Sequence, residues 1–299
     1  MTPAERRQPV NRLASSLANR RQILLGLGGL AGATLWPAWT TGQDATPAPA
    51  PMPPLVIPEI ELVGTNDALI FPSAISAGIN AITVRNESDT IMHTFAMRIP
   101  DGLTDDDAIA ALMTEDTPDW FGHTLFAGNP DEPQPGGGEL TGYVFYVPGH
   151  YMAVNPFSDG IATSFDVAGE PWGRPAPVAD FEVGLIDMAF LGFDEPIPAG
   201  PHLWRLTNHG TTWHDLTTLK APDGSTVDDL FAAFETTPED QVFPDGYMTT
   251  GGVGATSPGV STWVELNLEP GTHIAACFLP GEDGLPHAFN GMITAFEVV

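Results

Sequence analysis

The 299-residue sequence contains one cysteine, Cys277, and one lysine, Lys220. A single cysteine excludes an intramolecular disulfide framework and a metal cluster held by cysteines alone. Positive charge is scarce as well, since 10 Lys and Arg face 38 Asp and Glu. Five of these ten bases lie in the first 21 residues, so the rest of the chain repels phosphate backbones. Nucleic-acid binding is thereby excluded, and an anionic membrane surface is disfavoured.

Charged residues make up 16% of the chain, against about 25% in an average protein. In contrast, Gly (32) and Pro (30) are abundant, and the hydrophobic content of 42% is sufficient for a packed core. Many turns and few charges favour short strands over long, solvent-exposed helices. We therefore expect a β-rich protein.

The N-terminal region has the features of an export signal. Residues 19–25 (NRRQILL) resemble the twin-arginine signal, and the apolar stretch that follows ends at Trp36. This stretch is shorter than the roughly 20 residues of a spanning helix. We predict a twin-arginine-type signal peptide over residues 1–45 and an Ala/Pro linker over 46–56. The resemblance implies export of the folded protein to a periplasmic, extracytoplasmic or secreted location.

The remainder of the sequence contains an internal repeat of two similar halves. Residues 86–93 and 208–214 begin alike with Asn and end in His, and Pro-Asp-Gly recurs at 100–102 and 222–224, an offset of 122 residues. Each Pro-Asp-Gly precedes a predicted short helix with a Thr N-cap and acidic residues in its first turn. These two helices cover residues 104–112 and 226–234.

The ends of the two halves also match, with residues 148–155 parallel to 270–277. Alternating and β-branched segments predict strands, and Gly and Pro separate them. The segments concerned are 81–85, 203–206, 262–268 and 293–298. We predict two β-sandwiches in tandem, over residues 57–169 and 181–299, with a connector over 170–180.

Cys277 lies at the start of a Cys-x9-His-x4-Met pattern completed by His287 and Met292. The pattern connects two predicted strands, so a thiolate, an imidazole and a thioether would meet at one loop. Such ligands suit copper. His214 is the natural second imidazole because it follows Asn208-x-Gly210 at the repeat position, and His209 is the alternative. Taken singly, Cys277 and Met292 are explained by core packing, and His287 by a place in a surface loop.

This arrangement resembles the cupredoxin family, the blue copper proteins. The resemblance implies two tandem cupredoxin-like Greek-key β-sandwiches with short helical insertions, an all-β fold. It also implies one type 1 copper ion, with His214, Cys277 and His287 in the trigonal plane and Met292 as the weak axial ligand. Residues around His287 would form the electron-transfer face, namely Leu285, Pro286, Ala288 and Phe289. A zinc site would leave Met292 without a role.

The first half lacks these ligands. Asn155 aligns with Cys277, and His93 is the remaining histidine of the pattern. His93, His123 and His150 show no ligand spacing, so we expect this half to be empty of copper.

The sequence also lacks the further ligands of copper enzymes. Multicopper oxidases and copper nitrite reductases resemble tandem cupredoxins too, and this resemblance implies His-x-His pairs and a His beside the Cys. This sequence has no His-x-His pair, and Ala276 precedes Cys277 where that His would be required. Patterns of other enzymes, such as G-x-S-x-G, the P-loop and H-E-x-x-H, are also absent from the sequence. We expect an electron carrier rather than an enzyme.

Two alternatives stay open, a copper-binding or delivery protein without redox shuttling and a non-catalytic scaffold with a vestigial site. The excess of acidic residues after the signal region would suit a basic, cytochrome-like redox partner. It is also explained by adaptation to high salt or by solubility alone.

Overall fold

The computed structural model describes residues 56–112, 120–121, 124–155, 161–171, 173–238, 241–281 and 283–299. The predicted signal peptide, the linker up to residue 55, and His123 lie outside the described residues. Within the described part of the chain, no helix has the length and apolar character needed to cross a membrane.

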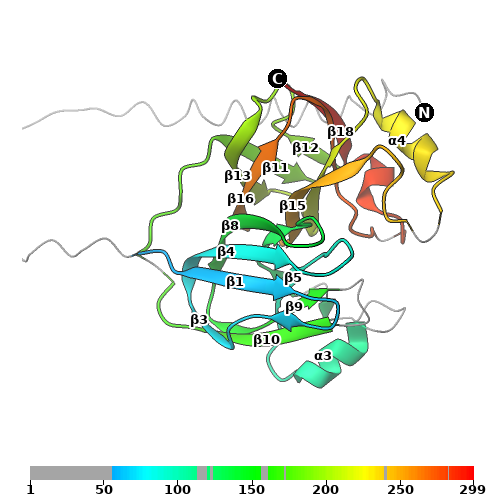
Figure 1. Ribbon diagram of the computed structural model, residues 1–299. Helices are drawn as coiled ribbons and strands as arrows, with labels where there is room; N and C mark the ends of the chain where they lie inside the picture. Colours follow the sequence, from blue (N-terminus) through cyan, green and yellow to red (C-terminus); the bar gives the residue numbers. More distant parts are fainter. Residues whose placement is uncertain are drawn as a thin grey trace, which may run out of the picture. The chain divides into compact units, whose positions relative to one another are not determined.

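One large sheet runs through both sequence halves (Figure 1). Its eight strands follow each other in the order β12 (Ala189–Leu191), β11 (Phe181–Ile186), β13 (Gly200–Asn208), β16 (Ser261–Leu268), β8 (Gly138–Tyr146), β4 (Gly78–Asn86), β1 (Glu59–Gly64) and β2 (Leu69–Ile70). The two halves join where β16 and β8 pair antiparallel, with Thr262 opposite Val144 and Val264 opposite Gly142. The halves therefore share a continuous hydrogen-bonded layer.

Each half of this layer packs against a five-stranded sheet. The sheet of the first half has the order β3 (Ala74–Ser76), β10 (Ile161–Ala168), β9 (Gly149–Asn155), β5 (Phe95–Arg98) and β6 (Leu125–Phe126). The sheet of the second half has the order β18 (Ile293–Val298), β17 (Gly271–Ala276), β14 (His214–Lys220), β15 (Met248–Thr256) and β7 (Pro130–Asp131). Strand β7 belongs to the first half by sequence but pairs with β15 of the second.

The space between the layers is filled by alternating residues of the strands, as the sequence periodicity predicts. In each half, large apolar side chains from both layers are buried in one cluster. They include Ile82, Val84, Val144, Tyr146 and Phe165 in the first half, and Trp204, Leu206, Val264, Leu266 and Phe296 in the second.

The internal repeat is visible in the structure. Strands β4 and β13 occupy equivalent positions, each parallel to the strand that opens its half. Each ends in an asparagine whose side-chain amide donates to a carbonyl four residues on, Asn86 to Thr90 and Asn208 to Thr212, both at 2.8 Å. These hydrogen bonds fold the short loop that leads to His93 in one half and to His214 in the other.

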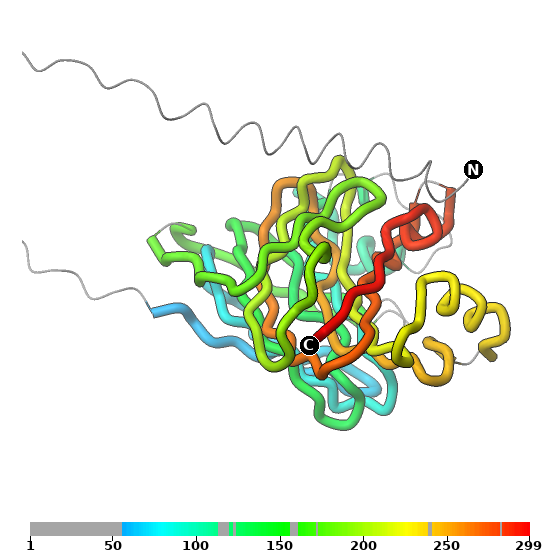
Figure 2. Tube along the Cα trace, turned by 90° about the horizontal axis from the view of Figure 1, so that it is seen from above, coloured from blue at the N-terminus to red at the C-terminus, as the bar shows by residue number. Residues whose placement is uncertain are grey.

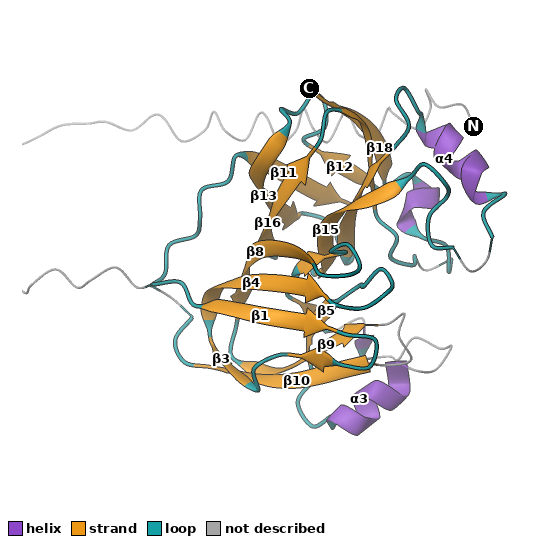
Figure 3. Ribbon diagram, in the orientation of Figure 1, coloured by secondary structure: helices purple, strands orange, loops and turns teal. Residues whose placement is uncertain are grey.

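Two α-helices occur in the described residues, α3 (Asp105–Leu112) and α4 (Val227–Phe234), both outside the sandwiches (Figure 3). The hydroxyls of Thr104 and Thr226 accept hydrogen bonds from the amides three residues on, as expected of N-caps. A 3-10 helix, η3 (His287–Asn290), precedes β18. Figure 2 shows this C-terminal loop beside α4, where Phe289 stacks on Phe231 with ring centroids 4.9 Å apart.

The predicted fold class is confirmed: the protein is all-β, with two β-sandwiches and short helical insertions. The sequence did not indicate that the halves share a sheet or that β7 pairs with β15 of the second half.

Because the shared layer depends on the close approach of β8 and β16, we expect Gly142→Ala to destabilise the protein. A methyl group at Gly142 would overlap the carbonyl oxygen of Trp263, a backbone atom that cannot rotate away. Overpacking of this kind costs about 1–3 kcal/mol of unfolding free energy, measurable by chemical denaturation. Gly184→Ala, on β11 of the same sheet, is the control because its methyl would meet the movable side chain of Leu191 at 3.2 Å. Equal losses in the two variants would contradict this account.

Candidate metal centre

Three buried side chains, His214, Cys277 and His287, meet at one end of the second sandwich. His214 is the first residue of β14, Cys277 directly follows β17, and His287 opens η3. Their exposed fractions are 0%, 0% and 2%. Two donor nitrogens and one sulfur, all within 4.8 Å of one another, thus face each other away from water.

The distances show which atoms converge. Nδ1 of His214 lies 3.2 Å from Nδ1 of His287, and Nδ1 of His287 lies 3.4 Å from Sγ of Cys277. The two imidazoles therefore present the same ring nitrogen to each other, and that of His287 also faces the thiol. This set of two nitrogens and one sulfur fits a thiophilic metal ion such as copper or zinc.

The backbone of the loop between Cys277 and β18 fixes these positions. The amide of His287 donates to the carbonyl of Leu279 at 2.9 Å, and the amide of Ala288 donates to the carbonyl of Cys277 at 2.8 Å. Gly291 ends η3 with φ of 111°, a left-handed conformation that glycine adopts without strain. The loop consequently folds back over the cysteine that begins it.

Met292 is fully buried and lies next to both loop ligands. Its amide donates to the carbonyl of His287, and its carbonyl accepts from the amide of Cys277, both at 3.0 Å. Its side chain belongs to the same buried cluster as Cys277. The structure thus brings together all four residues that the sequence predicted for the site, Met292 through its backbone.

A carboxylate outside the cluster orients His214. Oδ1 of Asp187 lies 3.3 Å from Nε2 of His214, and Asp187 itself accepts hydrogen bonds from the amide and hydroxyl of Thr211, each at 2.8 Å. A partner on the far ring nitrogen fixes the tautomer and leaves Nδ1 for a metal. Gly210 makes room for this contact, since a Cβ there would lie 2.8 Å from Nε2 of His214. The Asn-x-Gly segment before His214 is therefore part of the site.

Asp215 connects the cluster to its surroundings. Its amide points at Sγ of Cys277 at 3.5 Å, and its Oδ1 accepts the amide of Phe278 at 3.0 Å. Burial raises the pKa of Asp215 to about 7, with Glu132 and Asp131 adding to the effect.

Burial also decides the protonation of the three donors. It lowers the pKa of His214 and of His287, so both imidazoles are neutral at neutral pH. Burial, aided by Asp215, raises the pKa of the Cys277 thiol well above its ordinary value. The metal-free protein therefore holds a proton on sulfur, which a metal ion would displace.

The remaining histidines of the second half do not belong to the cluster around Cys277. His209, the alternative to His214, is exposed, and His202 lies 3.8 Å from Asp180 at the surface. His273 is buried and bonds the carbonyl of Glu269. In the predicted electron-transfer face, Leu285 and Phe289 are half exposed, but Ala288 is buried because its amide closes the loop. The expectation for Ala288 was wrong.

In the first half, His93 occupies the place of His214 but has different neighbours. Its Nδ1 lies 3.2 Å from Oδ2 of Asp131, and its Nε2 lies 2.9 Å from Oε1 of Glu132. Sequence reasoning missed both carboxylates, since they lie 38 and 39 residues along the chain without a recognisable pattern. His150 is not part of this group and contacts Asp105 and Asp166 instead.

No protein-family model and no curated protein matches the chain. Among solved structures, reduced auracyanin from the photosynthetic bacterium Roseiflexus castenholzii is 18% identical over 40% of this chain and 94% of its own, with a TM-score of 0.29. Auracyanin A, a "blue" copper protein from Chloroflexus aurantiacus, is 18% identical over 40% and 96%, with a TM-score of 0.28. The blue copper oxidase from Nitrosomonas europaea is 15% identical over 81% and 86%, with a TM-score of 0.23.

Strand order and donor set together define an all-β chain of two β-sandwiches with a buried cluster of two imidazoles and one thiol.

Because Asp187 orients His214, we expect Asp187→Asn to weaken metal binding by about 10–100-fold, the usual effect of losing such a partner. Competition against a chelator of known affinity measures the change. Asp194→Asn is the matched control, since Asp194 is exposed and lies close in sequence without contacting His214. A loss of the same size in both variants would refute the orienting role.

We expect metal binding near neutral pH to release about one proton, the one held by Cys277, because both imidazoles are already neutral. The apparent affinity should then rise about tenfold per pH unit, and more steeply at acidic pH where the imidazoles are charged. Calorimetric titration with Cu(I) in buffers of different ionisation enthalpy measures the release. Cys277→Ser should abolish it, and a wild-type protein that releases no proton would contradict the assignment.

Proposed function

We propose that this chain is an exported mononuclear type 1 copper protein that carries electrons between other proteins. His214, Cys277 and His287 would hold the ion in a trigonal plane, and Met292 would be the weak axial ligand. When bound, copper supplies a one-electron redox couple.

The observation that carries the proposal is the convergence of two Nδ1 atoms and one Sγ atom in a site that is at most 2% exposed. Imidazole and thiolate suit both oxidation states of copper, and a rigid, dry site keeps the ligands in place when the charge changes. The hydrogen bonds of the loop and the contact between Asp187 and His214 supply this rigidity.

Zinc would also accept two imidazoles and a thiolate. Burial of Met292 beside the cluster favours copper, because a thioether is a ligand for copper and has no role at a zinc site. The proposal therefore predicts a coloured Cu(II) protein.

A carrier fits this chain better than an oxidase. Ala276 stands before Cys277, and the sequence contains no His-x-His pair to hold further copper ions. The chain thus has the ligands for one buried ion but no corresponding set for a copper ion that binds substrate.

Electrons would enter and leave through the loop over His287. Leu285 and Phe289 are 52% and 48% exposed, which makes an apolar patch above the buried imidazole. Phe289 is held against Phe231 of α4, so the patch has a defined shape. Its partner would be a redox protein, basic and cytochrome-like if charge attraction guides the encounter.

Export rests on the twin-arginine-like segment at residues 19–25, and a periplasmic, extracytoplasmic or secreted location would follow.

A copper-delivery protein is the second candidate function, because the same donors would serve it. Fast exchange of copper with an acceptor protein would favour delivery.

We expect the copper-loaded protein to show a strong thiolate-to-Cu(II) band in the visible spectrum, which ascorbate bleaches and an oxidant restores. Cys277→Ser should remove the band because the thiolate that produces it is gone. Absorption spectroscopy of both proteins, each with its copper content measured, provides the test.

His209→Gln is the control, since it removes an exposed imidazole directly after the end of β13 and should keep the band. A colourless Cu(II) protein would overturn the type 1 assignment, and a band that survives in Cys277→Ser would overturn the ligand set.

A further inference from the structure

A second buried cluster of ionisable groups lies where the two halves meet. His93, Asp131 and Glu132 are 9%, 3% and 1% exposed, and each offers one donor atom within 4.8 Å of the others. His93 directly precedes Thr94 and β5, whereas Asp131 ends β7, the strand that pairs with the second half. None of these residues belongs to the cluster around Cys277.

Neighbouring groups fix both carboxylates from outside. Oδ1 of Asp131 accepts the amide of Thr94 at 2.6 Å, which leaves Oδ2 toward His93. Oε1 of Glu132 accepts the hydroxyl of Thr217 at 2.9 Å, and Oε2 accepts that of Thr249 at 2.6 Å. Carboxylates at metal sites are oriented by hydrogen bonds of this kind, and Thr217 and Thr249 come from the second half.

The charge of the cluster is incompletely balanced. Within the described residues, the ion pairs of Asp131 and Glu132 are with His93 and not with Lys or Arg. With both carboxylates ionised, the cluster carries one net negative charge even when its imidazole is protonated, and burial raises the pKa of Asp131 against that state. A divalent ion together with neutral imidazole would bring the charge to zero, and buried charges require such compensation.

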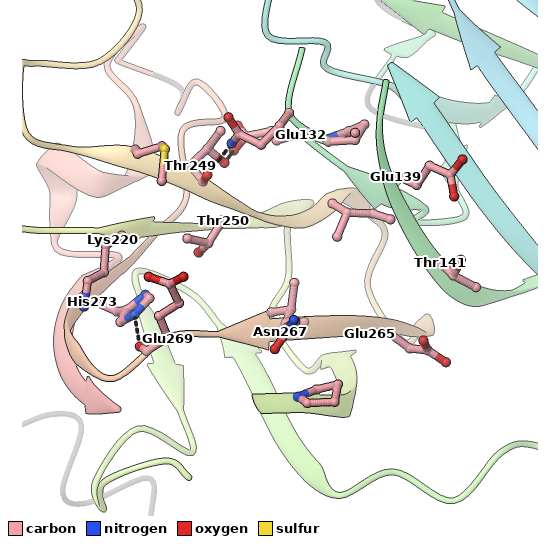
Figure 4. Close-up of a pocket in the computed structure, with 17 residues that line it drawn as sticks. Glu132, Glu139, Thr141, Lys220, Thr249, Thr250, Glu265, Asn267, Glu269 and His273 are labelled. Carbon is pink, nitrogen blue, oxygen red and sulfur yellow. Dashed lines mark hydrogen bonds between the residues drawn. The ribbon is translucent and has the colours of Figure 1, made fainter. Parts of the chain in front are cut away.

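The cluster has a route to solvent. Glu132 and Thr249 line a cavity of about 500 Å³ between the halves, where Figure 4 shows them joined by their hydrogen bond. The same cavity is lined by Glu139, Glu265 and Glu269, whose carboxylates attract cations. Lys220 also lines the cavity, but the carboxylates outnumber it, so an ion could approach Glu132 along a mainly acidic wall.

We propose that His93, Asp131 and Glu132 form a second metal site, which takes a divalent first-row transition ion. One imidazole and two carboxylates suit ions such as Zn²⁺ that accept nitrogen and oxygen ligands. Nδ1 of His93 faces Asp131 and Nε2 faces Glu132, so the ion would replace one of the two ring protons of the charged imidazole and leave the other in place. The ligands belong to the first half by sequence, and the hydroxyls that fix Glu132 belong to Thr217 and Thr249 of the second half. The ion therefore also stabilises the contact between the halves.

Zinc is the probe, because it is redox-inert and contributes no colour. The full chain is first loaded with one equivalent of copper, so that Cys277 is occupied, and is then equilibrated with Zn²⁺, desalted and analysed for both metals. We expect wild-type protein to retain about one zinc per chain and to unfold at a higher temperature than without zinc. Copper-loaded wild type that retains no zinc would overturn the proposal.

Glu132→Gln and Asp131→Asn should lose the zinc and its thermal shift but keep the copper. Glu265→Gln is the matched control, since it removes the same charge from another part of the cavity wall and should retain the zinc. Retention in Glu132→Gln, or equal loss in Glu265→Gln, would refute ligation by the cluster. Circular dichroism shows whether each variant is folded. If a variant is unfolded, the zinc content of the copper-loaded wild type decides whether the second metal site exists.

A further variant separates this proposal from the function proposed above. Cys277→Ser, without copper, should still retain about one zinc, and Glu132→Gln in the same background should retain none. If wild type fails to become coloured while this pair behaves as expected, the copper assignment fails and the second site stands.

Discussion

Strands β8 and β16 pair antiparallel at the centre of the molecule, and this pairing makes one sheet out of two sequence halves. It requires a residue without a side chain at Gly142, where the carbonyl of Trp263 approaches the backbone. Once the halves share this layer, β7 of the first half lies within reach of β15 of the second. The buried carboxylates at the end of β7 and the acidic cavity both depend on that crossing. The arrangement is therefore more than two independent domains joined by a linker.

The cluster around Cys277 shows how a loop and two strand ends produce a rigid donor set. Each donor is buried, and the backbone of the loop closes on itself through hydrogen bonds among His287, Cys277 and Met292. Asp187 fixes the far side of His214, and Gly210 leaves space for it. Burial keeps the imidazoles neutral and the thiol protonated, so the affinity for a metal ion is linked to pH.

The two halves use the same framework for different chemistry. Asn86 and Asn208 fold equivalent loops, and each loop ends in a buried histidine, His93 or His214. In the second half this histidine faces a thiol and another imidazole, whereas in the first it faces two carboxylates. Asp215 lies between the two environments, since it contacts Cys277 and its pKa responds to Glu132 and Asp131. The two halves thus share a framework, and the residues around each histidine differ.

Local pattern determined much of this protein. Three short-range patterns predicted the all-β fold and most of the residues at Cys277: the capped helices, the alternating strands and the Cys-x9-His-x4-Met spacing. The internal repeat, with its offset of 122 residues, added His214. The sequence could not show that β7 crosses to the other half, that Ala288 is buried, or that Asp131 and Glu132 face His93. These depend on contacts between segments far apart in the chain, and such contacts follow no fixed spacing. Only the tertiary structure decided them, because strand pairing across the shared sheet, rather than neighbourhood in sequence, brings those side chains together.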